Sequence, residues 1–295
     1  MKRLSKGVIF LIMIAMAGPL LLSGILYAAE PDKIVQSGAI LTVAESKRLI
    51  AKAVAQMPIV KNALANGMVI IIKGTTNAYV AEEITGQKVS HAAFVTGRVE
   101  PEKGAKLLPQ AKAVNHVILE KGKIVDISLD DAAKKLKRGD VVMKGANALD
   151  YKNKLAAVNI LHPAGGTTGI TMPFIVARKA YLVIPVGLEK LVTGDLVDLT
   201  LKMREPMESL PAPTGVSSTP FPGHILPSQW LLTGEIVTEL EAIEILTGAK
   251  AFQCSAGGVS GAEGSVWLVF RGTRNQVKKA MELVRSIHGE PPYTE

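Results

Sequence analysis

The amino-acid sequence predicts an α/β fold with a mostly parallel sheet, followed by a small α+β subdomain. Two observations lead to this prediction. Continuous β-branched and apolar runs, such as residues 68–72 and 180–185, are typical of strands that are buried on both faces of a parallel sheet. These runs end in loops rich in glycine, threonine or asparagine, and segments of helix-forming residues lie between the runs.

Residues 1–29 are predicted to be a targeting or membrane-anchoring segment. Lys2, Arg3 and Lys6 are basic, and no charged residue occurs from residue 8 to residue 29. This apolar stretch is long enough to cross a bilayer as a helix, which needs about 20 residues. A retained anchor and a cleaved signal peptide both fit the sequence. In either case the basic residues predict that residues 30–295 lie outside the cytoplasm, membrane-anchored or secreted.

Composition argues against several classes of function. Without residues 1–29 the formal net charge falls from +8 to +5, with 31 basic and 26 acidic residues. The basic clusters alternate with apolar residues at helical spacing and few aromatic residues accompany them, which argues against binding to nucleic acid. The chain has a single cysteine, Cys254, and five scattered histidines. This pattern supports neither a metal site nor a cofactor.

The first half of the chain begins with a capping box, in which the Thr42 hydroxyl and the Glu45 carboxylate satisfy each other's backbone amides. Asn66 and Gly67 are expected to end a second helix in the left-handed conformation that these residues tolerate. In chain order the sequence predicts a lead-in at 32–40, helices at 42–53 and 59–65, a strand at 68–72, a helix at 78–84, a strand at 91–99, a hairpin at 115–127 and a helix at 131–137.

The second half contains a proline-rich segment, residues 204–229, which is predicted to link an α/β domain (30–203) to a terminal subdomain (230–295). Before it the sequence predicts strands at 141–144, 156–161 and 180–185, and a helix at 171–178. After it the sequence predicts a helix at 239–246, strands at 249–255 and 265–271, and a helix at 276–287. This helix–strand–strand–helix order suggests a ferredoxin-like α+β subdomain.

Three loops of small polar residues follow predicted parallel strands. A strand, a small-residue loop and a helix N-terminus together expose free backbone N–H groups, which favour an anion. In open α/β sheets, ligands bind at the carboxyl ends of the strands. The sequence therefore predicts a site for a small anionic ligand. Its candidate residues are Gly74, Thr75, Thr76, Asn77, Lys144, Gly145, Asn147, Gly166, Thr167 and Thr168.

These motifs carry a resemblance over residues 43–191. The segments 47–84, 141–149 and 181–191 are similar, in order and spacing, to ribose-5-phosphate isomerase A. The chain also resembles the sugar-phosphate-sensing domains of DeoR-type repressors and the coenzyme A transferase-like group. The resemblance implies a Rossmann-like sheet. It further implies that Gly74, Thr75 and Thr76 hold a sugar phosphate and that Lys144 lies beside the reacting carbon, with Gly145 matching the glycine that follows this lysine.

The resemblance does not extend to the catalytic glutamate. In the isomerase that glutamate lies nine positions after the lysine, and the matching residue here is Asn153. An amide cannot move a proton between adjacent carbons as the enediol mechanism requires. Asp140 and Asp150 are the candidates for a relocated carboxylate. Isomerase activity is therefore not expected.

Three functional hypotheses follow. The first is a binding or sensing domain, held at or beyond the membrane through residues 8–29, for a phosphorylated or carboxylated small molecule. The second is an isomerase-like or acyl-transfer enzyme with a relocated carboxylate, with Lys144, Asp140 and Asp150 as candidate catalytic residues. The third is a structural or assembly protein whose terminal subdomain forms homo-oligomer contacts.

Overall fold

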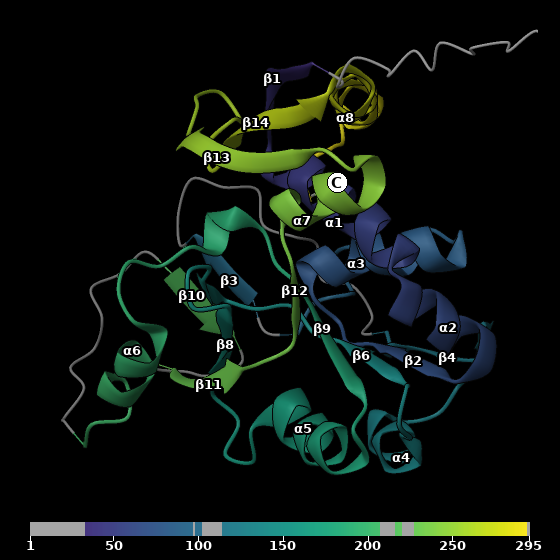
Figure 1. Ribbon diagram of the computed structural model, residues 1–295. Coiled ribbons are helices and arrows are strands. Elements are labelled where there is room, and N and C mark those ends of the chain that lie inside the picture. Colours follow the sequence, from purple (N-terminus) through teal and green to yellow (C-terminus); the bar gives the residue numbers. More distant parts are fainter. Residues whose placement is uncertain (1–32, 97, 102–113, 207–215, 220–226, 294–295) are drawn as a thin grey trace, which may run out of the picture. The chain divides into compact units, whose positions relative to one another are not determined.

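A computed structural model of the protein describes residues 33–96, 98–101, 114–206, 216–219 and 227–293 (Figure 1). The predicted targeting segment and most of the proline-rich segment 204–229 lie outside the described residues. Within those residues, no helix is both long enough and apolar enough to cross a membrane.

A six-stranded mixed sheet forms the centre of the fold, in the order β12-β9-β6-β2-β4-β5 (Figure 1). Strands β12, β9, β6 and β2 are parallel, and β4 and β5 continue the sheet in the antiparallel sense. The strands are β2 (Met68–Ile71), β4 (Val117–Glu120), β5 (Lys123–Ile124), β6 (Val141–Met143), β9 (Tyr181–Pro185) and β12 (Glu235–Val237). All residues of β2 and β6 are buried, so the prediction of doubly covered strands in a mostly parallel sheet is confirmed.

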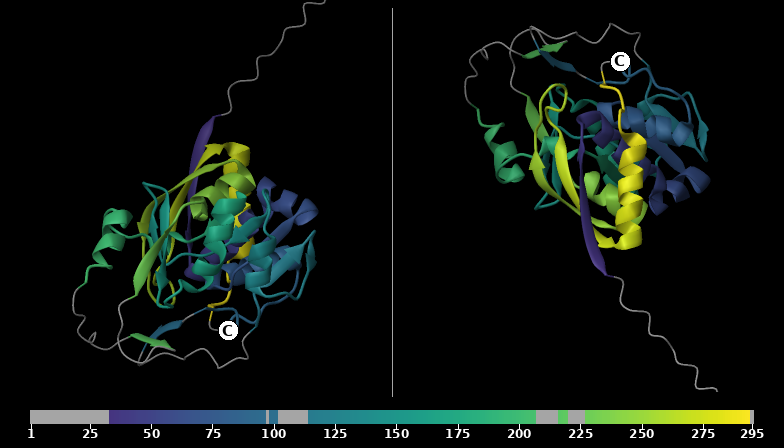
Figure 2. Two further views of the ribbon diagram at one scale, coloured as in Figure 1. Left: turned by 90° about the horizontal axis from the view of Figure 1, so that it is seen from below. Right: turned by 90° about the horizontal axis from the view of Figure 1, so that it is seen from above.

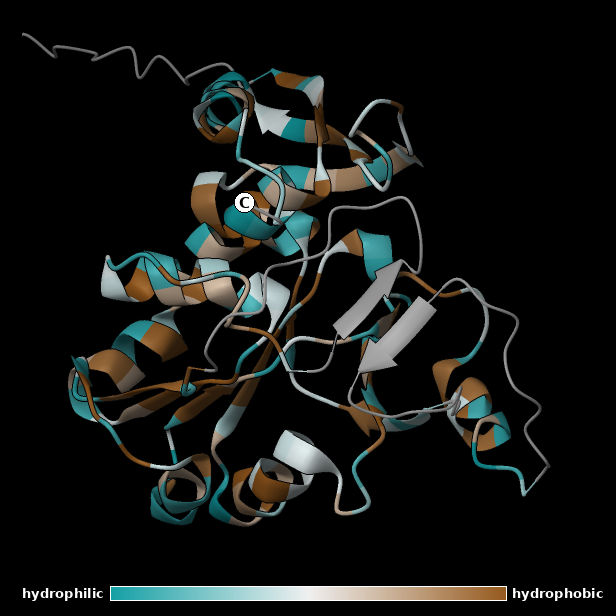
Figure 3. Cartoon of the chain, turned by 180° about the vertical axis from the view of Figure 1, so that it is seen from behind, coloured by the Kyte–Doolittle hydropathy of each residue, from teal (hydrophilic) through white to brown (hydrophobic). Residues whose placement is uncertain are grey.

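Helices cover both faces of this sheet. Figure 1 shows α1 (Val43–Gln56), α2 (Pro58–Asn66) and α3 (Thr75–Thr85) on one side. Helices α4 (Leu129–Lys135) and α5 (Gly166–Arg178) lie on the other side. In Figure 3 the strands between these two layers are coloured as hydrophobic, in agreement with the buried apolar cluster that joins the sheet to its helices. This two-sided cover explains why the strand sequences are continuous apolar runs.

A separate antiparallel sheet joins the two ends of the described chain. Strand β1 (Ile34–Leu41) pairs with β14 (Val266–Thr273), and β14 pairs with β13 (Lys250–Ala256). Helix α8 (Arg274–Ile287) lies against β1 and β14, as Figure 2 shows. The expectation of a mere lead-in at 32–40 was wrong. Exposure alternates along β1, but its partner strand lies at the far end of the sequence, where local pattern gives no signal.

A second small antiparallel sheet consists of β7 (Ala148–Asp150), β8 (Leu155–Ile160) and β11 (Ser228–Leu232). The sequence prediction counted β8 among the parallel strands, and this was wrong, because β8 pairs antiparallel to both neighbours. The predicted strand at 91–99 is also absent over residues 91–96. Instead β3 (Arg98–Pro101) pairs with β10 (Val216–Thr219).

The remaining elements are α6 (Leu196–Lys202), the 3-10 helix η1 (Leu188–Lys190) and α7 (Glu239–Thr247). Helix α7 follows β12 after one residue, and η1 follows β9 after two residues. These short connections bring the starts of η1 and α7 to the carboxyl edge of the parallel strands.

The starts of the helices follow the sequence more closely than their ends. Thr42 and Glu45 form the predicted capping box at α1. Gly67, by contrast, ends α2 at φ −135° and not in the left-handed region. A Cβ atom at this position would collide with Oδ1 of Asp140. Glycine is therefore needed at residue 67 for the close approach of a side chain, and not for a left-handed turn.

Candidate functional site

Lys144 follows β6 at the carboxyl edge of the sheet and is almost fully buried, with 8% of its surface exposed. Its Nζ atom donates a hydrogen bond to Oγ1 of Thr167 over 2.8 Å. Thr167 lies in the first turn of α5, so the second and third predicted loops meet here although the third loop follows an antiparallel strand. Both residues were predicted from the loop sequences, but only the structure shows that Lys144 and Thr167 are in contact.

Among the described residues, Lys144 has no carboxylate partner that would compensate its charge. Burial lowers the pKa of Lys144 to about 8, and no carboxylate in the described part of the chain opposes this shift. A buried ammonium without a negative partner is unfavourable, because desolvation penalises the charged form. A bound anion would compensate this charge, and without one the amine loses its proton at unusually low pH.

The first predicted loop lies beside this position. The buried Asn77 side chain donates through Nδ2 to the carbonyl oxygens of Ile72, at 2.7 Å, and of Met143, at 3.0 Å. It therefore ties the carboxyl ends of β2 and β6 together, directly before Lys144. The Oδ1 atom of Asn77 is buried without a hydrogen-bond partner among the described residues.

The N-terminus of α3 lies in the same loop. Gly74 is the N-cap residue and has no side chain to cap the helix, so the first amides of α3 are not satisfied by a cap. Thr75 is exposed and Thr76 is 8% exposed. Free amides at the start of an 11-residue helix favour an anion beside the Asn77 contact.

Two further basic residues, which the sequence analysis missed, lie near Lys144. The backbone N–H of Lys73 donates to Nδ1 of His116 over 3.0 Å. Burial, Lys73 and Lys144 together lower the pKa of His116 to about 4. Lys73 could have been found, because it follows β2 as Lys144 follows β6. His116 could not, because it precedes β4, whose antiparallel pairing with β2 places its start at this edge.

The N-terminus of α5 completes the cluster. Gly165 and Gly166 have φ values of 77° and 55°, which favour glycine, and no side chain caps the helix. Thr168 is 1% exposed, and its Oγ1 atom has no partner among the described residues. The loop therefore presents unsatisfied donors and a buried hydroxyl next to the Lys144–Thr167 contact. We call Lys73, His116, Lys144 and Thr167, with the starts of α3 and α5, the basic edge.

The candidate carboxylate Asp140 lies at the opposite end of β6 from Lys144. Its Oδ1 accepts from the backbone N–H of Met68 at 2.8 Å, and its Oδ2 accepts from that of Lys137 at 2.7 Å. Both oxygens are therefore engaged with the backbone. The structure separates this residue from the basic edge and gives it a role in holding β2 to β6.

The other predicted residues also take part in local structure. Asp150 accepts from the backbone N–H of Asn153 at 3.0 Å and from its Nδ2 at 2.8 Å, and these bonds lower the pKa of Asp150. Asn147 accepts through Oδ1 from the backbone N–H of Asn159. Gly145 lies beside the carbonyl oxygen of Pro185. Only Gly145 among these residues adjoins Lys144 in the chain. Asp150, Asn147 and Asn153 support the small sheet of β7 and β8.

A second polar cluster, missed by the sequence analysis, lies where β9 and β12 end. Lys47 of α1 pairs with Glu189 of η1 at 3.3 Å. Glu239, the first residue of α7, is fully buried and accepts from the backbone N–H of Leu188 over 3.0 Å. Burial, and then the charge of Glu189, raise the pKa of Glu239 to about 7. Lys47 therefore has a carboxylate partner, whereas the described residues provide none for Lys144.

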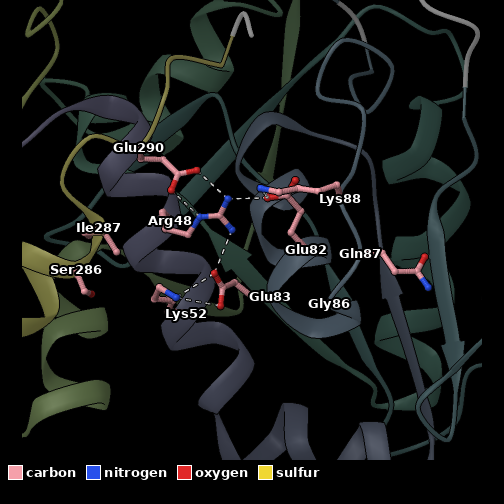
Figure 4. Close-up of a pocket in the computed structure, with 10 residues that line it drawn as sticks. All are labelled: Arg48, Lys52, Glu82, Glu83, Gly86, Gln87, Lys88, Ser286, Ile287 and Glu290. Carbon is pink, nitrogen blue, oxygen red and sulfur yellow. Dashed lines mark hydrogen bonds and ion pairs between the residues drawn. The ribbon is translucent and has the colours of Figure 1, made fainter.

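A cavity of about 460 Å³ opens between α1, α3 and α8 (Figure 4). Arg48 lies in it and pairs with Glu82 at 2.6 Å, Glu83 at 3.1 Å and Glu290 at 2.8 Å. Lys52 in turn pairs with Glu83 at 3.2 Å. These charges are already paired with one another, so the cavity offers an anionic ligand less than Lys144 does, for which the described residues provide no carboxylate partner.

The fold and the basic edge together define an α/β protein with a cluster of basic and hydroxyl groups at the carboxyl edge of a mostly parallel sheet. Comparison of the chain with family models, with curated proteins and with solved structures gave no match. The described residues contain no group of three or more histidine, cysteine, aspartate or glutamate side chains that could hold a metal ion.

Proposed function

We propose that this protein binds a small phosphorylated or carboxylated molecule at the basic edge. One observation carries the proposal: Lys144 is buried, and its amino group contacts the Thr167 hydroxyl with no carboxylate to balance its charge in the described chain. Buried charges in proteins are normally paired. An anionic ligand is the partner that this arrangement lacks.

The surrounding groups support an anion in particular. Lys73 and His116 add basic groups, and the uncapped N-termini of α3 and α5 add free backbone donors. Phosphate and carboxylate oxygens accept hydrogen bonds from amides at helix N-termini and charge-assisted bonds from lysine. Each hydrogen bond to a charged group contributes about 1.5–3 kcal/mol.

We also propose the finer fold that the resemblance implies. The parallel order β9-β6-β2, with loops and helix N-termini at its carboxyl edge, supports a Rossmann-like sheet of the isomerase and coenzyme A transferase-like kind. The antiparallel strands β13 and β14 between α7 and α8 support a ferredoxin-like subdomain, with β1 as an added strand. The apolar residues 8–29 support a protein held at or beyond the membrane.

The contacts of the two candidate carboxylates, Asp140 and Asp150, favour binding without isomerisation. Asp140 accepts from two backbone amides at the opposite end of β6 from Lys144. Asp150 accepts from the backbone N–H of Asn153. Neither carboxylate is placed to take a proton from a ligand that contacts Lys144.

Calorimetric titration of the full chain in detergent tests the proposal. The ligands are inorganic phosphate, ribose 5-phosphate and coenzyme A. We expect Lys144→Ala to weaken binding at least about tenfold, a loss of about 1.4 kcal/mol. Lys61→Ala removes an exposed lysine on α2 and serves as the matched control, with unchanged affinity expected. Equal affinities of the two variants, or no heat with any ligand, would refute the proposal.

A second candidate function, an enzyme of the isomerase or acyl-transfer type, is favoured by one observation. Glu189 and Glu239 lie after β9 and β12, at the same sheet edge as the basic edge. The Oε2 atom of Glu189 and the Oε1 atom of Glu239 lack hydrogen-bond partners among the described residues. If this candidate holds, ribose 5-phosphate or coenzyme A esters are turned over and Glu189→Gln abolishes turnover. Absence of turnover in the unmodified protein would exclude it.

A further inference from the structure

We propose that the ligand of the basic edge carries a carbonyl group next to its anionic group, and that Lys144 condenses with this carbonyl to form an imine. The inference rests on the proposed function, because the basic edge binds the anionic group of the ligand. It adds a covalent step and narrows the ligand to an aldehyde or ketone that also bears a phosphate or a carboxylate.

The geometry around Lys144 leaves its nitrogen available. The Nζ atom donates one hydrogen bond, to Oγ1 of Thr167 at 2.8 Å. In the neutral amine this contact engages an N–H group and leaves the lone pair free. The side chain is 8% exposed, so the amine is shielded from water but not sealed. Desolvation of this kind is one of the ways in which proteins activate a lysine as a nucleophile.

Burial keeps this amine neutral more often than other lysines. It lowers the pKa of Lys144 to about 8, and no carboxylate among the described residues opposes this shift. About a tenth of the amine is therefore unprotonated at pH 7. An ordinary lysine, with a pKa near 10.4, is unprotonated in only about one molecule in 2,500 at that pH.

Lys47 shows why burial alone is insufficient. It is 6% exposed, similar to Lys144, but its Nζ atom lies 3.3 Å from a carboxylate oxygen of Glu189. Burial lowers the pKa of Lys47 as well, but the Glu189 carboxylate opposes this shift and engages the Nζ atom in an ion pair. The described part of the chain thus contains two buried lysines, one with a carboxylate partner there and one without.

The condensation is balanced with the groups at hand. The Nζ lone pair attacks the carbonyl carbon, and the π electrons move to the oxygen. One amine proton passes from nitrogen to that oxygen, through the Thr167 hydroxyl, to give the carbinolamine. The C–O bond then breaks as the nitrogen lone pair forms the C=N bond, and the second amine proton leaves with the oxygen as water. No oxidant or reductant is needed.

The test uses pyridoxal 5′-phosphate as a probe, because it combines an aldehyde with a phosphate. The full chain in detergent is incubated with a limiting amount of probe and reduced with borohydride, and the label on each lysine is measured by peptide mass spectrometry. We expect Lys144 to be labelled at least about tenfold more than the exposed Lys61. Lys47, whose Nζ atom is paired with Glu189, should be labelled less than Lys144. Inorganic phosphate should protect Lys144, and pyridoxal without its phosphate should label it more weakly.

The variant Lys144→Arg separates the inference from the proposed function. Arginine keeps the positive charge and forms no stable imine, so this variant should retain phosphate binding and lose the label. If phosphate binds but Lys144 is labelled no more than Lys61, the imine is refuted and the anion site stands. If pyridoxal 5′-phosphate and pyridoxal label Lys144 equally and phosphate gives no protection, the anion site at the basic edge is refuted. The proposed class of ligand is then refuted as well.

Discussion

The Nζ atom of Lys144 and the Oγ1 atom of Thr167 lie 2.8 Å apart, at the meeting point of a parallel strand end and a helix N-terminus. Lys144 comes from the central sheet, whereas Thr167 follows a strand of a different, antiparallel sheet. The contact therefore links two sheets and defines where their polar loops converge. Its strength should be visible in both stability and ligand affinity.

Replacing Thr167 with valine tests the structural part of this contact. Valine has nearly the shape of threonine but cannot accept the hydrogen bond, so the buried amine loses its described partner. We expect the free energy of unfolding at pH 7 to fall by about 1–3 kcal/mol, as measured by urea denaturation. Thr75→Val is the control, because Thr75 is exposed in the first turn of α3. Equal losses in the two variants would contradict the prediction.

The convergence of these polar loops could be predicted from the sequence only in part. Continuous apolar strands and the capping box at Thr42 are local patterns, so the central sheet and α1 could be predicted. The pairing of β1 with β14 and the position of His116 depend on which distant strands become neighbours. Likewise, the small polar residues predicted part of the basic edge, but only the structure shows that no described carboxylate compensates the charge on Lys144.

The low pKa of Lys144 predicts a pH-dependent stability. The folded-state pKa is lowered to about 8, whereas an unfolded lysine has a pKa near 10.4. Between these values the unfolded state binds more protons, so the free energy of unfolding should rise with pH because of this residue. The penalty from Lys144 is full below pH 8 and disappears above pH 10.4, with a size of about 3 kcal/mol at most.

Lys144→Met isolates this contribution, since methionine is similar in length and does not titrate. Relative to the unmodified protein, the variant should be more stable at pH 7, and the difference should shrink toward pH 10. Urea denaturation across this range gives the difference directly. Parallel stability curves for the two proteins would show that Lys144 titrates normally in the folded state.

Gly67→Ala should destabilise the fold from the opposite end of β6. The added Cβ atom would collide with Oδ1 of Asp140, which accepts from the backbone N–H of Met68. We expect a loss of about 1–3 kcal/mol in the free energy of unfolding, typical of overpacking, together with a lower melting temperature. Gly74→Ala is the matched control, because no atom lies within 4 Å of a Cβ placed there. The prediction fails if both variants melt together.

Glu239→Gln tests the polar cluster at the ends of β9 and β12. Burial and Glu189 raise the pKa of Glu239 to about 7 in the folded state, above its ordinary value. The stabilisation linked to this raised pKa is complete below about pH 4.3, the unfolded value, and is lost as pH rises through 7. Above pH 7 the buried Glu239 carboxylate is therefore ionised in the folded protein, and its charge lowers the free energy of unfolding. Glutamine resembles the protonated acid and can still accept from the backbone N–H of Leu188.

The glutamine variant should match the unmodified protein near pH 4.5 and exceed its stability by about 1–3 kcal/mol at pH 8. Glu244→Gln, on the exposed side of α7, is the control and should show no such pH-dependent gain. Thermal unfolding at the two pH values distinguishes the cases. A glutamine variant less stable than the unmodified protein at pH 8 would mean that ionised Glu239 stabilises its neighbours. In that case the ion pair between Lys47 and Glu189 would extend to Glu239 as one charged network.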